Sequence, residues 1–348
     1  MIVGKKLALR GITLLGVLFS VLLLVVVTLG ATGLSDNMLK AIVSDQLREL
    51  RTSLAQTIRD PLELEKVLEQ RRNQLYDFYG LDEPWYNRLP DLIIRVLSLD
   101  LGSARNLKSF SGSSKVSDIV LERLPNTILL VTTALIISGL LGLYFGVKLA
   151  IKAGTKFDRF FSYLSSISYA LPTWWLGIIF ILLLAFQLRI FPPTGMYSSP
   201  PPSDNLLKFL DLLWHASLPI LTLVVASIGG WIYSVRTMVL NVAQEDFVTL
   251  GRAKGLKEST IMKRYIIRVA APPILTGLIL GLAGSLGGAI LTETVFGWPG
   301  MGRLYYDAIL ALDENVIIAL TFLFTLIYII ARFILEALYM VLDPRVRY

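Results

Sequence analysis

Long runs of apolar residues alternate with polar stretches along the whole chain. A helix needs about 20 apolar residues to cross the hydrocarbon core of a bilayer. The pattern therefore predicts six membrane-spanning helices, at Gly11–Leu29, Asn126–Leu149, Phe160–Leu188, Leu213–Leu240, Ile274–Leu291 and Val316–Val341. The first run follows Lys5, Lys6 and Arg10, as in a signal peptide. Its length and the poor cleavage site GATG favour a retained span.

The composition supports an all-α polytopic membrane protein. Hydrophobic residues make up 54% of the 348 residues and charged residues 17%, and the mean hydropathy is +0.64. A soluble domain of this composition would expose much apolar surface. The absence of cysteine excludes disulfides and thiolate metal sites, and the single histidine excludes an imidazole cluster, so no metal site is predicted.

The basic residues predict the orientation. The formal net charge is +7, which we attribute to cytoplasmic loops and not to a nucleic-acid partner. Cations near the span ends gather on one side of the predicted topology: Lys5, Lys6, Arg10; Lys148, Lys152, Lys156, Arg159; the loop 241–273; Arg345, Arg347. We therefore expect both termini to be cytoplasmic.

The polar segment 33–123 is then external. Ser35–Arg59 has the spacing of an amphipathic helix. Asp60 is a good N-cap for a second helix because Pro61 and Glu63 follow it, and Gly80 is a suitable stop. These helices could form a lid or spacer, or a docking platform for an external protein. The Pro- and Ser-rich stretch IFPPTGMYSSPPPSDN, residues 190–205, is expected to be a rigid connector or a gate.

Motifs for catalysis are missing. The chain has no GxxxxGK[ST] loop, so it is not expected to hydrolyse ATP, and it has no GxSxG or HExxH sequence. His215 near Ser217 could suggest a membrane-embedded enzyme, although an interfacial histidine is the favoured interpretation. Arg332 and Glu336 are expected to form an i,i+4 pair. No catalytic residue is predicted.

Glycine pairs four residues apart occur in the second and fifth predicted spans, at Gly142 and Gly146, Gly277 and Gly281, and Gly284 and Gly288. Such spacing predicts close helix packing. The glycines of the fifth span could also line a pathway.

The loop 241–273 is polar and basic between two apolar spans. Asn241–Lys254 and Leu256–Ala270 are each expected to form a helix, with a turn at Gly255 and a break at Pro272-Pro273. A helical hairpin joined to two spans would act as a lever.

This loop carries a specific resemblance. EDFVTLGRAKGLKESTIMKRYIIRVAAPPIL resembles the EAA loop of ABC importer permeases of the oligopeptide/dipeptide family. YGLDEPWYNRLPDLIIRVLSLDLGSA, VSDIVLERLPNTILL, TETVFGWPGMGRLYYDAILALDENVI and the ending DPRVRY are similar to further segments of that family. The resemblance covers about residues 75–348.

The resemblance implies a type I ABC importer permease fold with six transmembrane helices, to which the helices predicted in 33–123 add an enlarged extracytoplasmic segment. The chain is therefore expected to divide into 1–32 (N-terminus and first span), 33–123 (extracytoplasmic segment) and 124–348 (five-helix core with coupling loop 241–273). The implied ATPase-coupling residues are Glu245, Asp246, Arg252, Ala253 and Gly255. The substrate-binding residues are not identified.

The resemblance also implies the partners: a related second permease, two cytoplasmic ATPase subunits that bind ATP and Mg²⁺, and an extracytoplasmic solute-binding protein, in a prokaryotic cell membrane. No cofactor is expected in this chain. Oligopeptides are the expected substrate, with oligosaccharides or nickel chelates as alternatives, and an enzyme or a sensor as more distant ones. Tyr265-Ile266 and GATGLSDN depart from the family pattern.

Overall fold

The computed structural model describes residues 2–342, so the expected ending DPRVRY lies outside the described residues. Helices form nearly all of the regular structure there, and a single isolated bridge joins Ser103 to Lys115. Among the described residues, five helices are long and apolar enough to cross a membrane: Leu9–Ala31, Val116–Ile151, Asn205–Ala243, Glu258–Ser285 and Glu314–Tyr339.

The predicted third span is broken in the structure. Lys156–Ala170 and Thr173–Gln187 meet at 96°, and the described residues contain six spans only if this bent pair counts as one. Leu171 is extended, with φ −84° and ψ 125°, because the proline ring of Pro172 disfavours a helical conformation in the residue before it. The expectation of one continuous helix over Phe160–Leu188 was therefore wrong.

The described residues fall into two compact units. The first contains residues up to 11, 120–306 and those from 326 onwards, and the second contains 12–119 and 307–325.

The helices in chain order are α1 Ile2–Ala31, α2 Leu34–Leu54, α3 Pro61–Phe78, η1 Trp85–Arg88, α4 Leu89–Leu97, α5 Val116–Thr127, η2 Ile128–Thr132, α6 Thr133–Ile151, α7 Lys156–Ala170, α8 Thr173–Phe180, η3 Ile181–Gln187, α9 Asn205–Ala243, α10 Asp246–Ala253, α11 Glu258–Thr260, η4 Ile261–Ile266, α12 Ile267–Ser285, α13 Ile290–Val295, α14 Met301–Leu310 and α15 Glu314–Leu342.

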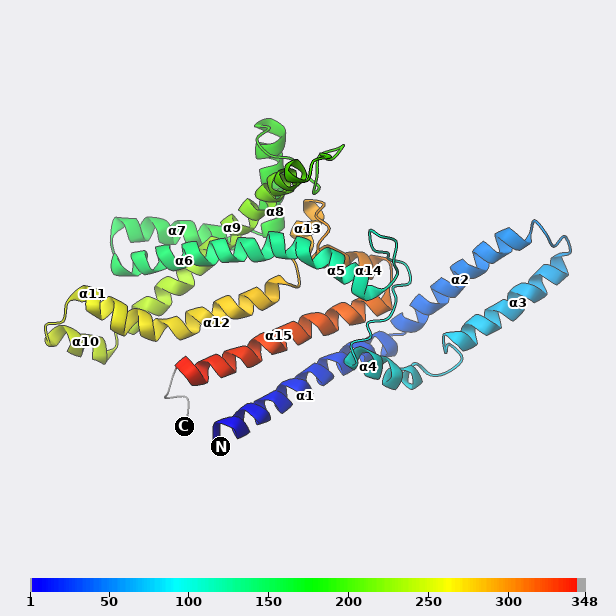
Figure 1. Cartoon of the computed structure of the whole chain (residues 1–348), viewed down its shortest axis with the longest axis horizontal. Helices are drawn as coiled ribbons and strands as arrows, with labels where there is room; N and C mark the ends of the chain where they lie inside the picture. The colour runs from blue at the N-terminus through cyan, green and yellow to red at the C-terminus, as the bar shows by residue number, and fades with distance from the viewer. Residues whose placement is uncertain (1, 343–348) are drawn as a thin grey trace. The chain divides into compact units, whose positions relative to one another are not determined.

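In the first unit, α6 and α7 both lie along α9 (Figure 1). A Cβ added to Gly142 would lie 2.4 Å from the Trp231 Cβ, and one on Gly146 would lie 2.7 Å from the Val235 Cβ. These contacts confirm the predicted close packing of the second span. In the fifth span the outcome differs along the helix: a Cβ on Gly281 would lie 3.3 Å from the Leu135 Cδ1, which is a close contact, whereas one on Gly284 would meet nothing within 4 Å.

The contact of α7 with α9 is closer still. A Cβ on Gly229 would lie 2.2 Å from the Ser165 carbonyl oxygen. The Ser168 hydroxyl donates to the Val225 carbonyl (2.5 Å) and accepts from the Gly229 amide (3.3 Å). That carbonyl and amide would otherwise pair with each other within an α-helix. A side chain from α7 thus enters the hydrogen-bond ladder of α9, a feature that bends helices.

Pro272 and Pro273 lie inside α12, so the predicted break before the fifth span was wrong. A π-helical segment, η4, directly precedes this helix. Membrane helices tolerate internal prolines where local π-helical turns and neighbouring groups satisfy the freed carbonyls.

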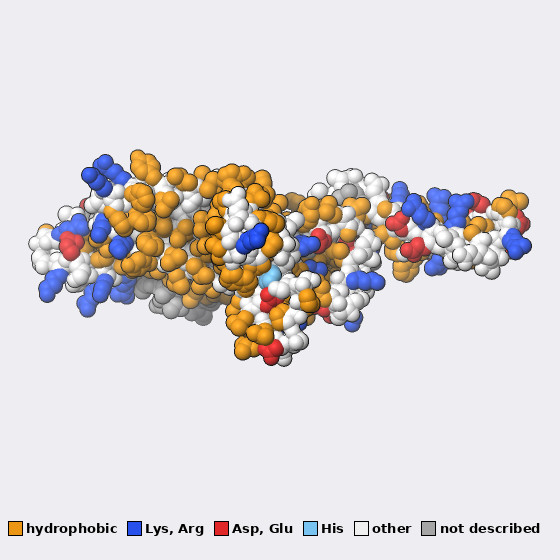
Figure 2. All heavy atoms as spheres, turned by 90° about the horizontal axis from the view of Figure 1, so that it is seen from above, with side chains coloured by type: hydrophobic (Ala, Val, Ile, Leu, Met, Phe, Trp, Pro, Cys, Tyr) orange, Lys and Arg blue, Asp and Glu red, His pale blue; other side chains and the backbone are white. Residues whose placement is uncertain are grey.

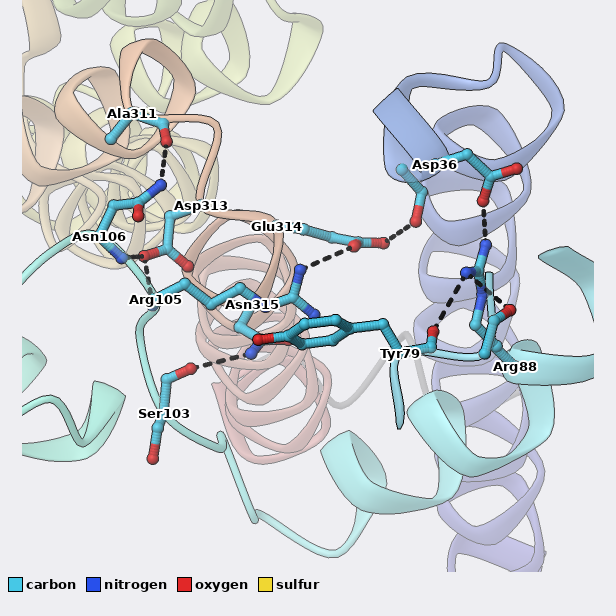
Figure 3. A network of polar contacts seen from close by, with 12 residues as sticks. Asp36, Tyr79, Arg88, Ser103, Arg105, Asn106, Ala311, Asp313, Glu314 and Asn315 are labelled. Atoms are coloured by element: carbon cyan, nitrogen blue, oxygen red, sulfur yellow. Dashed lines mark hydrogen bonds and ion pairs between the residues drawn. The ribbon is translucent and has the colours of Figure 1, made fainter. Parts of the chain in front are cut away.

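In the second unit, α2 and α3 form an antiparallel hairpin (Figure 1). The predicted cap is confirmed, because the Asp60 carboxylate accepts from the Leu62 amide at 3.0 Å. Gly80 ends α3 in the left-handed region, with φ 63°. Arg88 pairs with Asp36 of α2 and donates to the carbonyls of Tyr79 and Gly80 (Figure 3). These bonds fix the start of α4 to the hairpin.

Candidate functional site

The loop 241–273 folds as two short helical pieces between α9 and α12. Helix α9 ends at Ala243, and α10 begins after Glu245, whose backbone is extended. Gly255 is left-handed, with φ 73°, and its amide donates to the Arg252 carbonyl at 2.9 Å. The predicted turn at Gly255 is confirmed. The predicted first helix, Asn241–Lys254, was too long because the chain turns at Gln244 and Glu245.

One side of α10 is locked onto the rest of the unit. Val248 is fully buried and Gly251 is buried. Val248 packs in one cluster with Val239 of α9 and with Ile261 and Ile266 of η4. Burying aliphatic side chains of this kind stabilises such a contact by about 1.5–3 kcal/mol each. Helix α10 is therefore held by the ends of two long helices.

The other side of α10 carries the predicted coupling residues. Glu245, Asp246, Arg252, Ala253 and Gly255 are all exposed. The Arg252 Nε lies 2.9 Å from the Glu258 Oε1, an ion pair that joins the end of α10 to α11.

Two apolar residues of α10 were missed by sequence reasoning. Phe247 is 37% exposed and Leu250 is 54% exposed. They lie three residues apart, so they share a face of the helix. Each of them directly precedes a buried residue, Val248 or Gly251. The three-residue spacing of Phe247 and Leu250 was the only sign in the sequence that the two side chains share a face of the helix.

Cations surround this end of the first unit. Figure 2 shows Lys and Arg side chains at the end that carries α10 and α11, and hydrophobic side chains along the neighbouring helices. The exposed cations of these segments are Lys152, Lys156, Arg159, Lys254, Lys257, Lys263, Arg264 and Arg268.

A cavity of about 500 Å³ lies between the α7–α8 break, α9 and α12. Its lining is neutral, with hydroxyl, aromatic and small residues and no charged side chain: Tyr169, Leu171, Thr173, Ala226, Ser227, Gly230, Trp231, Ser234, Val235, Met238, Pro273, Ile274 and Gly277. Gly277 is the member of the fifth-span glycine pattern that faces this space. The extended Leu171, at the break between α7 and α8, lines the cavity.

Glu293 on α13 is a buried acid that the sequence analysis did not single out. It is fully buried, and its carboxylate accepts from the Ala289 amide (3.2 Å), the Thr127 hydroxyl (3.1 Å) and the Arg303 amide (2.8 Å). Burial raises the pKa of Glu293, against the lowering effect of these hydrogen bonds.

The bonds of Glu293 hold the connection between α12 and α14 in shape. Thr127 also accepts from the Met301 amide at 2.7 Å, so one hydroxyl ties α5 to both α13 and α14. A Cβ on Gly300 would lie 2.5 Å from the Glu293 Oε2. The role of this cluster is therefore to position the connection.

His215 does not form a dyad with Ser217. Its Nδ1 lies 2.9 Å from the Asp211 carbonyl oxygen and 3.3 Å from the Asp211 carboxylate. The Ser217 hydroxyl donates to the Trp214 carbonyl at 2.5 Å. Within residues 2–342, no group of three or more His, Asp or Glu side chains could hold a metal ion. The expected pair of Arg332 and Glu336 is confirmed, at 3.8 Å.

Comparison with known proteins agrees with this architecture. Residues 138–348 match the family model described as "Binding-protein-dependent transport system inner membrane component". The chain is 29% identical to the oligopeptide transport system permease protein AppB of Bacillus subtilis over 92% of its length and 96% of the relative's. It is 31% identical to the di/tripeptide transport system permease protein DppB of Pseudomonas aeruginosa, over 83% and 90%. It is 29% identical to the dipeptide transport system permease protein DppB of Escherichia coli K12, over 81% and 87%. The chain belongs to the family of binding-protein-dependent transport system inner membrane components.

Proposed function

We propose that this chain is the permease subunit of an ATP-driven importer for peptides. Relatives that match over at least four-fifths of the chain are named as oligopeptide, di/tripeptide or dipeptide permeases. The neutral cavity between α7, α9 and α12 suits such a substrate. Hydroxyl groups can hydrogen-bond to any peptide backbone, whereas a fixed charge would select particular side chains.

Import by this chain requires partner proteins. It has no nucleotide-binding loop, so two ATPase subunits supply the energy, a related second permease completes the pathway, and a solute-binding protein delivers the peptide. Residues 1–32 form the N-terminus and the first span, residues 33–123 form the extracytoplasmic segment, and residues 124–348 form the five-helix core with the coupling loop. Both termini and the loop 241–273 face the cytoplasm of a prokaryotic cell, and the segment 33–123 faces outward.

Helix α10 transmits the ATPase motion. Glu245, Asp246, Arg252 and Ala253 contact the ATPase directly, and Gly255 allows the turn that presents them. Exposed Phe247 and Leu250 add apolar contact area. The observation that carries this proposal is the two-sided character of α10: Val248 is fully buried, while the predicted coupling residues are exposed. Movement of α10 is then passed to α9 and α12.

The absence of cysteine gives a clean experiment. Ala253→Cys places one thiol on α10, and Ala153→Cys places one in the exposed turn between α6 and α7 as a matched control. A thiol-anchored photo-crosslinker in membranes of the assembled complex should join Ala253→Cys to the ATPase subunit, with a yield that changes on adding ATP. Ala153→Cys should give little product. Equal yields at both positions, or none at Ala253→Cys, would overturn the role of α10.

A further inference from the structure

A second cavity, of about 720 Å³, lies within the second unit. The end of α3, the end of α4 and the loop that follows α4 line it, together with Lys115 and Asn315. Three cations line this cavity, Arg95, Arg105 and Lys115, against one acid, Asp100. Its charge therefore differs from that of the neutral cavity between α7, α9 and α12.

Among residues 2–342, two of these cations have no acidic partner. Arg105 is partly neutralised, because it lies 3.9 Å from the Glu314 carboxylate (Figure 3). Within the part of the chain that the structure describes, the Arg95 side chain donates only to the neutral amide oxygen of Asn315 (3.1 Å), and its Nε is buried without a hydrogen-bond partner. No carboxylate of the described residues lies within 4.0 Å of the Lys115 ammonium, whose side chain is exposed. Asp100 instead accepts from the Gly102 amide.

The rim of this cavity is apolar and exposed. Phe78 is 78% exposed and Leu99 is 64% exposed. A small anion would satisfy the cations and leave these side chains in water. A protein surface that carries an acid beside apolar residues would cover both.

Leu99 has an unusual backbone. Its φ is 63°, and it follows α4 at the position where helices commonly end with a left-handed glycine. The Leu99 amide donates to the Val96 carbonyl (3.1 Å) and the Asp100 amide to the Arg95 carbonyl (3.1 Å), which is a Schellman motif. A leucine in the left-handed region costs conformational energy that glycine avoids. Burial does not offset that cost here, because the side chain is mostly exposed.

We propose that this cavity is a docking site for the solute-binding protein, which inserts an acidic side chain between Arg95 and Lys115 and covers Leu99 and Phe78 with apolar residues. The inference rests on the proposed function, since it needs a binding protein on the outer side. The strained, exposed leucine is then explained, because its side chain is buried only in the complex. Arg95, held by Asn315, needs little reordering to meet the acid.

The test measures the affinity of the transporter's own binding protein for the assembled complex in nanodiscs. That binding protein is the one that supports peptide uptake by the wild-type complex. Lys115→Glu should weaken binding about tenfold or more and reduce its dependence on salt. Lys66→Glu, on the exposed part of α3, changes the charge equally outside the cavity and should bind as the wild type does.

Leu99→Gly separates docking from folding. It should weaken binding while the unfolding temperature of the permease stays the same or rises, because glycine relieves the left-handed strain. A purely structural role for Leu99 predicts unchanged binding.

Unchanged affinity in both Lys115→Glu and Leu99→Gly would overturn the proposal. Unchanged affinity with a raised KM for peptide would overturn it too, and would assign the cavity to the peptide. A wild-type complex that imports peptide equally well without any binding protein would contradict the proposed function itself.

Discussion

Arg236 on α9 and Asp158 on α7 form a two-pronged ion pair, with Nε–Oδ1 at 2.6 Å and Nη2–Oδ2 at 2.7 Å. The Asp158 side chain is 3% exposed and that of Arg236 is 22% exposed. Asp158 also accepts from the Gly154 amide in the turn before α7. The pair therefore fixes the α6–α7 turn to the part of α9 that leads into α10.

Removing the guanidinium should be costly, since it leaves a buried carboxylate without its cation. We expect Arg236→Met to lower the free energy of unfolding by about 3 kcal/mol, measured by thermal unfolding in detergent. Arg332→Gln is the control. Its contact with Glu336 is long, at 3.8 Å, and Glu336 keeps a second cation, Arg10, at 3.6 Å, so about 1 kcal/mol or less should be lost. Equal losses in the two variants would contradict the structural role of the Asp158 pair.

Gly229 should tolerate no side chain. A methyl group there would lie 2.2 Å from the Ser165 carbonyl oxygen, so α7 and α9 would have to separate. We expect Gly229→Ala to destabilise the protein by about 2 kcal/mol or more, again by thermal unfolding. Gly284→Ala, with open space around the added Cβ, should be neutral or slightly stabilising. A neutral Gly229→Ala would show that the two helices are not in close contact.

The helix content, the spans and the turn at Gly255 could be predicted from apolar spacing and from glycine. The proline positions were harder to interpret. Pro172 breaks the third span, whereas Pro272 and Pro273 lie inside α12. The same residue type has opposite outcomes because neighbouring turns and packing decide whether the freed carbonyls are satisfied, and local sequence does not contain that information.

Gly255 should be replaceable by alanine but not by proline. Nothing lies within 4 Å of an added Cβ, so Gly255→Ala carries only the left-handed strain, about 1 kcal/mol. Proline fixes φ near −65° and removes the amide that donates to Arg252. We expect ATP-driven peptide uptake to survive in Gly255→Ala and to be lost in Gly255→Pro at equal membrane expression. Normal uptake by the proline variant would contradict the need for this turn.

Glu293 should make stability depend on pH. Its pKa is raised above the ordinary 4.5, so in the interval between the two values the folded state binds more protons than the unfolded state. The free energy of unfolding then falls as pH rises through that interval. The favourable contribution is complete below the ordinary pKa and is lost above the raised pKa.

Glu293→Gln should flatten this profile, because the amide does not titrate. The measurement is the unfolding temperature in detergent between about pH 4 and about pH 8, with Glu63→Gln on exposed α3 as the control. Glu293→Ala should be less stable than Glu293→Gln, since it leaves the Arg303 amide without its acceptor. A Glu293→Gln profile as steep as the wild type's would show that this acid does not cause the dependence.

Part of the candidate site could be predicted from the sequence. The loop motif selects Glu245 and its neighbours as coupling residues; the structure shows that they are exposed, and their role in coupling stays a prediction. Burial of Val248 could not be foreseen, because its partners Ile261 and Ile266 lie beyond the turn. Leu99 and Glu293 were also beyond prediction. No local sequence pattern indicates that a leucine will adopt the left-handed backbone conformation. A buried acid is recognised only from the amides that surround it in the folded structure.

The function proposed for this chain is the ATP-driven import of peptides. The direct measurement is accumulation of a radiolabelled tripeptide in proteoliposomes that contain the two permeases, the ATPase subunits and the binding protein, with a labelled trisaccharide and a nickel chelate as competing substrates. We predict that only the peptide accumulates, only with ATP inside the compartment that the loop 241–273 faces, and that Gly255→Pro abolishes the accumulation. Accumulation of the sugar or the chelate instead of the peptide, or peptide accumulation without ATP, would contradict the account.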